Sequence, residues 1–442
     1  MRANRRKKSI GLILVFFVCI LCFSPPFQYF ASFPEELRLF SGQVKKLNLD
    51  MPVNAMVTVQ NPGIVQVNGR SGHSLQVDLK QPIALQSMHT GQTYMQLKLF
   101  GKIPLKTVKV DVVPDLKVIP GGQTIGVKIK SAGILVVGHH MVSVADKKIS
   151  PGEQADIRLG DLITEMNGER LNDVAKVSAI VNEAGKNNKL LKLKVIRNGQ
   201  KYVKEIIPAF DVNDRVYRMG LYIRDSAAGV GTLTFYSPDY GVYGALGHVI
   251  TDMDTQTPIV LGSGEIMNSS VTSISKSHNG EPGEKRAHFF KENKLLGNIE
   301  KNSDFGIFGK IYESPGNSTW NQPIPVAFAE EVKEGPAQIL TVIDGQKVEK
   351  FDIEVVHVAA QRHPATKGMV IRITDPRLLQ KTGGIVQGMS GSPIIQNGKL
   401  IGAVTHVFVN DTTSGYGCFI EWMLKDAGIL LRPEEIPQFQ AS

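Results

Sequence analysis

The sequence predicts a mainly β protein built from several domains, and three observations lead to this expectation. Polar and apolar residues alternate with a period of two through residues 37–113, a pattern typical of half-buried strands. From Phe210 onward, short apolar runs are again separated by glycine-rich turns. A chain of 442 residues is too long for one compact domain, so we expect two to four.

The amino terminus has the pattern of an export signal. Five basic residues within positions 2–8 precede an apolar run of 14 residues at 10–23, and two prolines then end any helix. The run is short for a membrane span, and no clear small-x-small cleavage site follows it. We assign residues 1–30 to a signal peptide or a signal-anchor, and we expect the bulk of the chain to be exported.

Composition argues against nucleic-acid binding, disulfides and metal. The net charge is +9, but the five basic residues at the amino terminus leave only about +4 on the remainder, which is weak for a nucleic-acid partner. Cys19 and Cys22 lie in the apolar segment, so Cys418 has no partner for an internal disulfide. No Cys/His spacing resembles a zinc site, and the adjacent His139 and His140 would point in opposite directions on a strand. We expect no metal and no cofactor.

Two domains are predicted before the carboxy-terminal half. Residues 31–116 predict a small β-sandwich-like domain without a catalytic constellation. Residues 117–208 contain two strands, the run GDLITEMNG at 160–168, a helix and two further strands, and this order resembles a bacterial PDZ domain. In such domains a peptide adds as an extra strand, and a backbone loop holds its terminal carboxylate. By position, the residues that match this loop are Thr124, Ile125, Gly126 and Val127.

Residues 388–393, GMSGSP, place a serine between glycines. A serine attacks a carbonyl only if its hydroxyl is exposed, has a base beside it and faces amides that can hold the oxyanion. Because the flanking glycines allow a sharp turn, Ser390 is the candidate nucleophile, and the N–H groups of Gly388 and Ser390 are the candidate oxyanion donors. Ser392 is a weaker rival. The plain alternative is that the Gly-Ser-Pro cluster only makes a turn.

A base and a carboxylate complete such a site. His248 is preferred as the base because glycines and apolar residues surround it, and His406, on the strand after the serine hairpin, is the runner-up. Asp375 ends an apolar strand and could point into a cleft, although Asp-Pro also begins turns. The carboxylates that compete with it are Asp252, Asp254, Asp304 and Asp352.

The chain order His248, Asp375, Ser390 matches that of chymotrypsin-like enzymes, and residues 388–393 resemble their Gly-x-Ser-Gly-Gly-Pro turn. We therefore expect residues 209–442 to form a chymotrypsin-like double β-barrel protease. Met389 stands where zymogen-activated members have an acidic residue, so activation through a new amino terminus is not expected.

Three runs, at 243–248, 382–393 and 402–422, resemble the SpoIVB peptidases of endospore-forming bacteria. The resemblance extends over the whole chain and implies a PDZ-containing serine endopeptidase. It also implies export from the forespore into the space between the two membranes, with the amino-terminal segment as a possible anchor in the forespore inner membrane. The implied substrates are the membrane-anchored inhibitor subunit of an intramembrane metalloprotease complex and the chain itself. Cutting the inhibitor would release processing of a pro-sigma factor during sporulation.

Two other functions remain open at this point. A non-catalytic signalling adaptor would use the PDZ domain to bind a peptide ligand, with the β-barrels as a scaffold. A general envelope quality-control protease would share the chemistry but act on unfolded protein.

Overall fold

The computed structural model describes residues 33–289, 295–315, 320–361 and 363–429, with four isolated positions nearer the amino terminus. Apart from those positions, the predicted signal segment lies outside the described residues. Among the described residues, no helix is long and apolar enough to span a membrane. The chain forms two compact units that divide between Leu116 and Lys117.

The first unit is all β and has one apolar core. One sheet has the order β1-β8-β7-β3-β5, with β1 and β8 parallel, and a second has the order β2-β6-β4. Side chains that alternate along these strands fill the shared core, as the period-two pattern requires. The strands are β1 (Glu36–Phe40), β2 (Val44–Leu47), β3 (Asn54–Val59), β4 (Val65–Val67), β5 (Ser74–Asp78), β6 (Ile83–Ser87), β7 (Gly91–Leu99) and β8 (Ile103–Val113).

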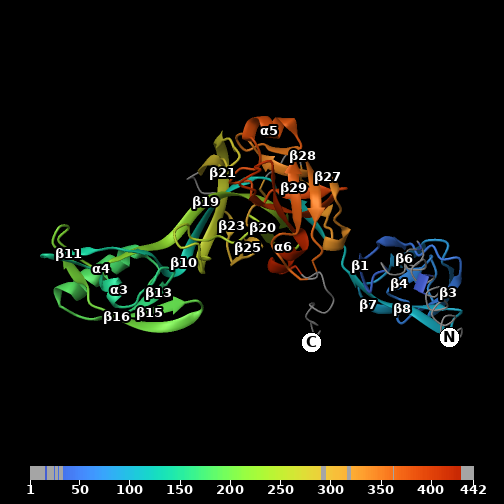
Figure 1. Ribbon diagram of the computed structural model, residues 1–442, viewed down its shortest axis with the longest axis horizontal. Coiled ribbons are helices and arrows are strands. Elements are labelled where there is room, and N and C mark those ends of the chain that lie inside the picture. The colour runs from blue at the N-terminus through green and yellow to red at the C-terminus, as the bar shows by residue number, and fades with distance from the viewer. Residues whose placement is uncertain are drawn as a thin grey trace, which may run out of the picture. The chain divides into compact units, whose positions relative to one another are not determined.

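A closed six-stranded barrel forms the carboxy-terminal part of the second unit (Figure 1). Its strand order is β27-β28-β29-β32-β31-β30, and closure leaves no strand edge unpaired around the ring. The strands are β27 (Gly335–Val342), β28 (Val348–Val358), β29 (Met369–Ile373), β30 (Pro393–Gln396), β31 (Lys399–Val407) and β32 (Ser414–Phe419). Helices α5 (Pro376–Thr382) and α6 (Ile420–Asp426) and the short 3₁₀ turn η1 (Ala329–Glu331) accompany it.

A half-barrel lies before the closed barrel in the chain and has its own apolar core. The expected pair of barrels is thus one closed barrel and one open one. The strands of the half-barrel are β9 (Lys117–Pro120), the first part of β10 (Thr124–His139), the second part of β19 (Leu221–Ser237), β20 (Val242–Ala245), β21 (Leu261–Ser275), β22 (Glu284–Phe289), β23 (Leu295–Asn298), β24 (Lys301–Ser303), β25 (Gly306–Lys310) and β26 (Ile324–Pro325).

The PDZ lobe occupies the residues between the two parts of these long strands. A 13-residue helix, α4 (Val174–Lys186), begins at the N-cap Asp173, whose side chain accepts the Ala175 N–H. The lobe has its own core, to which α4 contributes buried residues. Its elements are β11 (Val142–Val144), β12 (Lys147–Ile149), α3 (Pro151–Gln154), β13 (Leu162–Met166), β14 (Glu169–Arg170), α4, β15 (Leu191–Arg197), β16 (Gln200–Ile206), β17 (Ala209–Asp211) and β18 (Val216–Arg218).

The expected boundary at 208/209 does not separate two bodies, because β10 and β19 each run through both. Residues 124–130 of β10 pair with 226–232 of β19 inside the half-barrel, and residues 135–139 pair with 221–224 in the PDZ lobe. The PDZ lobe is therefore inserted into a hairpin of the protease. The two strands expected at the start of the PDZ-like region, at 124–130 and 133–137, form one continuous strand.

Residues 124–127 do not form the predicted carboxylate-binding loop. Thr124, Ile125, Gly126 and Val127 lie in β10 and are buried. Ile125 pairs with Gly231 of β19 on one side and with Asn268 of β21 on the other. Because both edges of this stretch are already paired, no peptide can add to it as a strand.

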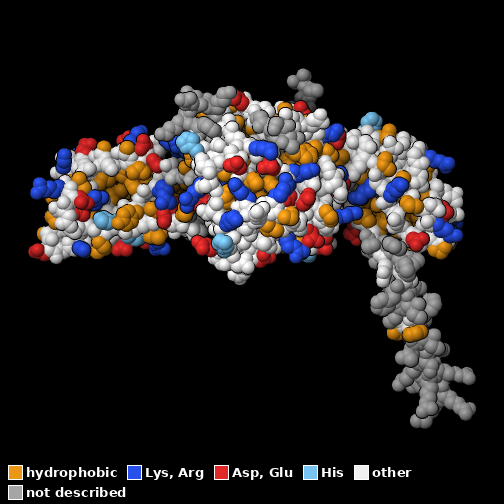
Figure 2. Space-filling view, turned by 90° about the horizontal axis from the view of Figure 1, so that it is seen from above, with side chains coloured by type: hydrophobic (Ala, Val, Ile, Leu, Met, Phe, Trp, Pro, Cys, Tyr) orange, Lys and Arg blue, Asp and Glu red, His pale blue; other side chains and the backbone are white. Residues whose placement is uncertain are grey.

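Figure 2 shows that the positive and negative side chains on the face in view are interspersed rather than gathered into one basic patch. This distribution agrees with the modest charge of the chain beyond its amino terminus.

Candidate active site

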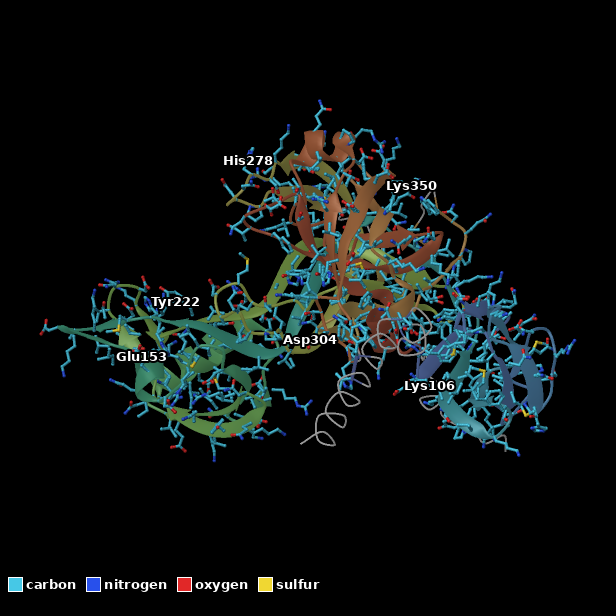
Figure 3. All side chains as sticks on the ribbon, turned by 45° about the vertical axis from the view of Figure 1, so that its right-hand side comes forward. Lys106, Glu153, Tyr222, His278, Asp304 and Lys350 are labelled. Carbon is cyan, nitrogen blue, oxygen red and sulfur yellow. The ribbon has the colours of Figure 1, made fainter. Side chains whose placement is uncertain are left out.

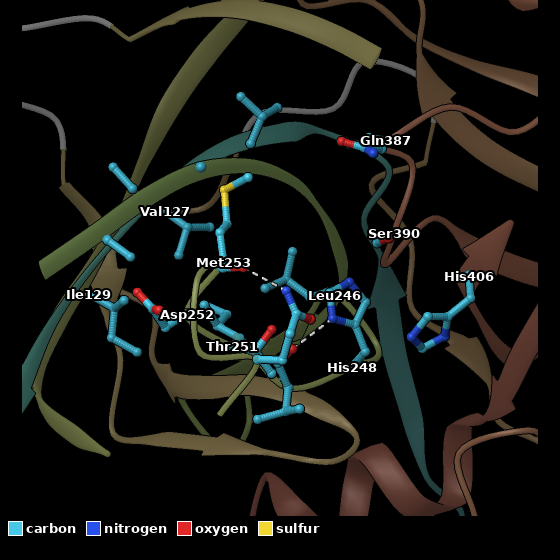
Figure 4. Close-up of a pocket in the computed structure, with 18 of the residues that line it drawn as sticks. Val127, Ile129, Leu246, His248, Thr251, Asp252, Met253, Gln387, Ser390 and His406 are labelled. Atoms are coloured by element: carbon cyan, nitrogen blue, oxygen red, sulfur yellow. Dashed lines mark hydrogen bonds between the residues drawn. The ribbon is translucent and has the colours of Figure 1, made fainter. Parts of the chain in front are cut away.

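A cleft of about 880 Å³ brings together the predicted base and nucleophile (Figure 4). His248, Ser390 and His406 all line it, together with Gly388 of the glycine turn. Val127, Ile129 and residues 226–230 of β19 form an apolar wall. The cleft is thus lined by strands of the half-barrel on one side and by the serine turn that leads into β30 on the other.

The serine turn is held tightly against β19. The Thr232 hydroxyl donates to the Gly388 carbonyl at 2.7 Å, and the Thr232 N–H donates to the Ser390 carbonyl at 2.9 Å. Gly391 has φ +93°, and a Cβ there would lie 2.1 Å from the Thr232 carbonyl oxygen. Only glycine fits this approach, so the sequence GMSGSP sets the position of Ser390 through backbone contact.

The amides of the turn divide into paired and unpaired donors. Met389 N–H donates to the Val386 carbonyl and Gly391 N–H to the Val404 carbonyl. Within the described residues, no backbone acceptor is recorded for the N–H groups of Gly388 and Ser390, which are the two predicted oxyanion donors. A donor that is not engaged in the fold can serve an oxyanion without first breaking a bond.

His248 is half-buried and its Nδ1 lies 2.8 Å from the Val249 carbonyl oxygen. Because a carbonyl can only accept, Nδ1 carries the proton and Nε2 is the free acceptor, which is the tautomer a general base needs. Burial lowers the pKa of His248, and the bond to Val249 offsets this in part. The imidazole is therefore neutral at neutral pH.

The backbone that presents His248 is unusual. Leu246 and Gly247, the two residues before it, both adopt positive φ, 71° and 72°. For leucine this conformation costs about 1–2 kcal/mol. Strain of this kind persists only where the surroundings enforce it, and here Leu246 N–H donates to the Thr232 carbonyl, beside the serine turn.

His406 lies beside His248, with ring centroids 5.2 Å apart. His406 is an exposed residue, but the partial burial of its ring lowers its pKa. The interaction with the neighbouring His248 lowers that pKa further. The Ser390 hydroxyl donates at 2.9 Å to the carbonyl of Thr405, the residue before His406. In this arrangement the serine proton rests on a backbone carbonyl, with both imidazoles in the same cleft.

Asp375 does not join the two residues it was expected to assist. It is the N-cap of α5, accepts the Arg377 N–H at 2.9 Å and pairs with the Arg377 guanidinium at 2.8 Å. That pairing lowers the pKa of its carboxyl. It is absent from the lining of the cleft, so the turn-forming alternative for Asp-Pro describes this position.

Two of the rival aspartates do line the cleft. Asp252 is buried and accepts from Thr255 and from the Arg224 guanidinium. Burial alone would raise its pKa, but these hydrogen bonds lower it overall. Asp304 is exposed at the turn between β24 and β25. Asp254 pairs with Arg224, and Asp352 belongs to β28.

The rival serine and Cys418 are both inaccessible. Ser392 is fully buried. Cys418 is buried as a free thiol, and burial raises its pKa to about 12, which suppresses the reactive thiolate. Ser390 is the half-buried hydroxyl of the turn that lines the cleft.

Three groups at the site were not found from sequence. The carbonyls of Val249 and Thr405 act through the backbone, so their side chains give no signal. Lys285 is 1% exposed, its Nζ donates to the Thr341 hydroxyl at 2.7 Å, and its stem lies against Gly388. It occurs in the polar run 281–288, which gives no hint of a buried amine.

Residues 215–424 match the SpoIVB peptidase S55 family, and residues 124–206 match the PDZ domain. Over residues 215–424 the chain resembles the SpoIVB peptidases. It is a serine peptidase. The SpoIVB match begins within the last strands of the PDZ lobe and ends in α6, so it contains both cleft walls formed by β19 and the serine turn.

Two solved structures resemble parts of this chain. The active form of the Rv3671c protease from M. tuberculosis is 16% identical, with 46% of this chain and 75% of that chain covered and a TM-score of 0.26. An inactive serine-to-alanine form is also 16% identical, with 45% and 82% covered and a TM-score of 0.24. At these values the likeness supports no detail of the site.

Proposed function

We propose that this chain is an exported serine endopeptidase that makes a regulatory cut in a membrane-bound partner, and in itself, during endospore formation. The observation that carries the proposal is that His248 and Ser390 line one cleft inside the region that matches the SpoIVB peptidases. The family match supports the sporulation role, and the cleft supports the chemistry.

The proposed mechanism begins when the Ser390 hydroxyl leaves the Thr405 carbonyl and donates to Nε2 of His248. The serine oxygen attacks the scissile carbonyl as Nε2 takes its proton, and the oxyanion that forms is held by the N–H groups of Gly388 and Ser390. His248 then returns the proton to the leaving amine, and water repeats the sequence on the acyl-enzyme. The Val249 carbonyl keeps the imidazole in the required tautomer throughout.

The apolar wall of the cleft supports an extended peptide as substrate. Residues 226–230 of β19 line it, and Gly229 has open space above its Cα. We propose that the membrane-anchored inhibitor subunit of an intramembrane metalloprotease complex presents such a segment. Its cleavage would release processing of a pro-sigma factor in the space between the forespore and mother-cell membranes.

The test compares Ser390→Ala with Ser392→Ala in the full chain, incubated with the ectodomain of the inhibitor subunit. We expect Ser390→Ala to lose cleavage of the partner and of itself by at least about 10³-fold, whereas Ser392→Ala keeps most of it, because its hydroxyl is buried. Undiminished cleavage by Ser390→Ala would refute the proposal. Preserved signalling without cleavage would instead indicate an adaptor, and rapid cleavage of unfolded protein alone would indicate quality control.

A further inference from the structure

A segment of the same chain occupies the peptide-binding edge of the PDZ lobe. The sheet order β16-β15-β13-β10 makes residues 133–139 of β10 the edge of the PDZ sheet, and β19 is the next strand. Residues 221–224 pair with this edge antiparallel, His139 with Leu221 and Leu135 with Arg224. Antiparallel strand addition at a sheet edge is how a PDZ domain takes a peptide.

The side chains of this segment occupy the lobe in alternation. Met219 is buried in the PDZ core, and Tyr217, Leu221 and Ile223 pack against the same core. A Cβ on Gly185 of α4 would lie 2.1 Å from the Tyr217 ring, and one on Gly152 of α3 would lie 2.3 Å from Leu221. Glycine at these two positions makes room for the segment. Tyr222, labelled in Figure 3, lies between the partly buried Leu221 and Ile223 and is 56% exposed.

Polar contacts fasten both ends of the segment to α4. The Tyr217 N–H donates to Asn182 Oδ1 at 3.0 Å. At the other end, Asp225 Oδ2 accepts the N–H of Val174, in the first turn of the helix, at 3.1 Å. The segment thus lies along α4 and β10 as a bound peptide would, although it has no terminal carboxylate.

We propose that residues 216–225, here called the resident strand, are an internal ligand of the PDZ groove, and that a partner binds there by displacing them. The partner is an extended peptide with large apolar side chains at alternate positions, since that is the pattern the groove already accommodates. Residues 124–127 take no part, because both of their edges are paired.

Displacement of the resident strand by a partner also affects the catalytic cleft, through Arg224. Arg224, in the resident strand, pairs with Asp252 and Asp254. Asp252 accepts the Thr255 N–H and shapes the turn four residues after His248. Displacing the resident strand removes Arg224 from this turn, which lines the cleft. The inference does not depend on the substrate proposed above.

A disulfide between β10 and the resident strand would hold the resident strand in the groove. A Cβ on Gly138 would lie 3.6 Å from the Tyr222 Cβ, within the usual Cβ–Cβ range of a disulfide, about 3.5–4.5 Å. The pair Gly138→Cys/Tyr222→Cys is placed in the full chain carrying Ser390→Ala, so that nothing is cleaved. The probe is a fluorescent peptide with the sequence of residues 215–225, RVYRMGLYIRD. Gly138→Cys alone is the control.

We expect the oxidised pair to bind the probe at least about tenfold more weakly than the same protein after reduction, while the control is insensitive to reductant. Leu221→Ala, which loosens the resident strand, should bind the probe about tenfold more tightly than Tyr222→Ala, whose side chain is exposed. Bound probe should also speed hydrogen exchange at 249–256. Equal binding by the oxidised and reduced pair, or no binding by any variant, would overturn the proposal. Because the binding variants carry Ser390→Ala, their result does not depend on peptidase activity, and failure of the proposed function would leave it intact.

Discussion

At the scale of single residues, backbone carbonyls do much of the work at this site. The Val249 carbonyl fixes the His248 tautomer, and the Thr405 carbonyl holds the Ser390 hydroxyl. A carbonyl orients an imidazole as a carboxylate does, but it stabilises the imidazolium less because it carries no full charge. The site is therefore organised for proton abstraction at a neutral histidine.

The first prediction concerns pH. The base must be neutral, and burial lowers the pKa of His248 from its ordinary value of 6.5, so activity should persist below that pH and fall only as the lowered pKa is crossed. We expect the acid limb of kcat/KM against pH to have its midpoint below 6.5. His248→Ala should remove at least about 10³-fold of kcat, while His406→Ala keeps more than a tenth. The reverse ranking would make His406 the base.

The second prediction separates two roles for Asp375. Asparagine caps a helix about as well as aspartate, so Asp375→Asn should preserve α5 and change kcat less than about tenfold. Asp375→Ala should lower stability by about 1 kcal/mol through loss of the cap. Steady-state kinetics and thermal melts measure both. A loss of about 10⁴-fold in kcat for a folded Asp375→Asn would instead show that the carboxylate reaches His248 in the working enzyme.

The third prediction concerns the buried amine of Lys285. Burial lowers its pKa from 10.5 to about 7. Between these values the unfolded chain binds the proton and the folded chain does not, so the free energy of unfolding rises with pH across that window. Below about pH 7 the buried amine destabilises the folded state by the full amount. Lys285→Met should therefore be most stabilising, relative to wild type, at pH 6–7, and its advantage should shrink toward pH 10. Urea denaturation at pH 6.5 and 10 tests this, and a difference that does not vary with pH would contradict it.

At the scale of elements, the serine turn depends on glycine for two separable reasons. Gly391 and Gly398 both have positive φ, 93° and 76°, but only Gly391 has backbone within 4 Å of an added Cβ. We expect Gly391→Ala to lower kcat about 100-fold because the turn must shift away from β19. Gly398→Ala, which carries the φ strain alone, should lose about 1 kcal/mol of stability and little activity. Equal activity of the two variants would count against contact as the cause.

Sequence reasoning succeeded where the signal is local. The period-two strands, the helix expected at 172–184 and found at 174–186, and the glycine-flanked serine follow from propensity and turn chemistry. It failed where pairing is distant: nothing in 124–130 reveals that its partners lie at 226–232 and 263–268. The sequence also allowed Asp375 to begin a turn. Only the position of α5 shows that its carboxylate caps this helix and does not line the cleft.

At the scale of the whole molecule, the PDZ lobe and the protease form one compact unit, residues 117–429. A fragment that begins at 209, the expected start of the protease, lacks β9 and β10, and β10 is the strand between β19 and β21. We expect this fragment to be unfolded, whereas a fragment of 117–429 should melt in a single cooperative transition. Circular dichroism and calorimetry distinguish these outcomes, and a folded, active 209–429 fragment would show that the shared strands are dispensable.

The inserted position of the PDZ lobe also has a consequence for biosynthesis. As the chain emerges from the ribosome, residues 124–130 appear about 100 residues before the first of their partners, at 226–232. Until then both edges of an apolar stretch are open to other chains. The PDZ core is largely complete in the newly made chain by residue 206, so it can fold first. Its folding then brings the two halves of the hairpin together and shortens the search by which the catalytic region is assembled.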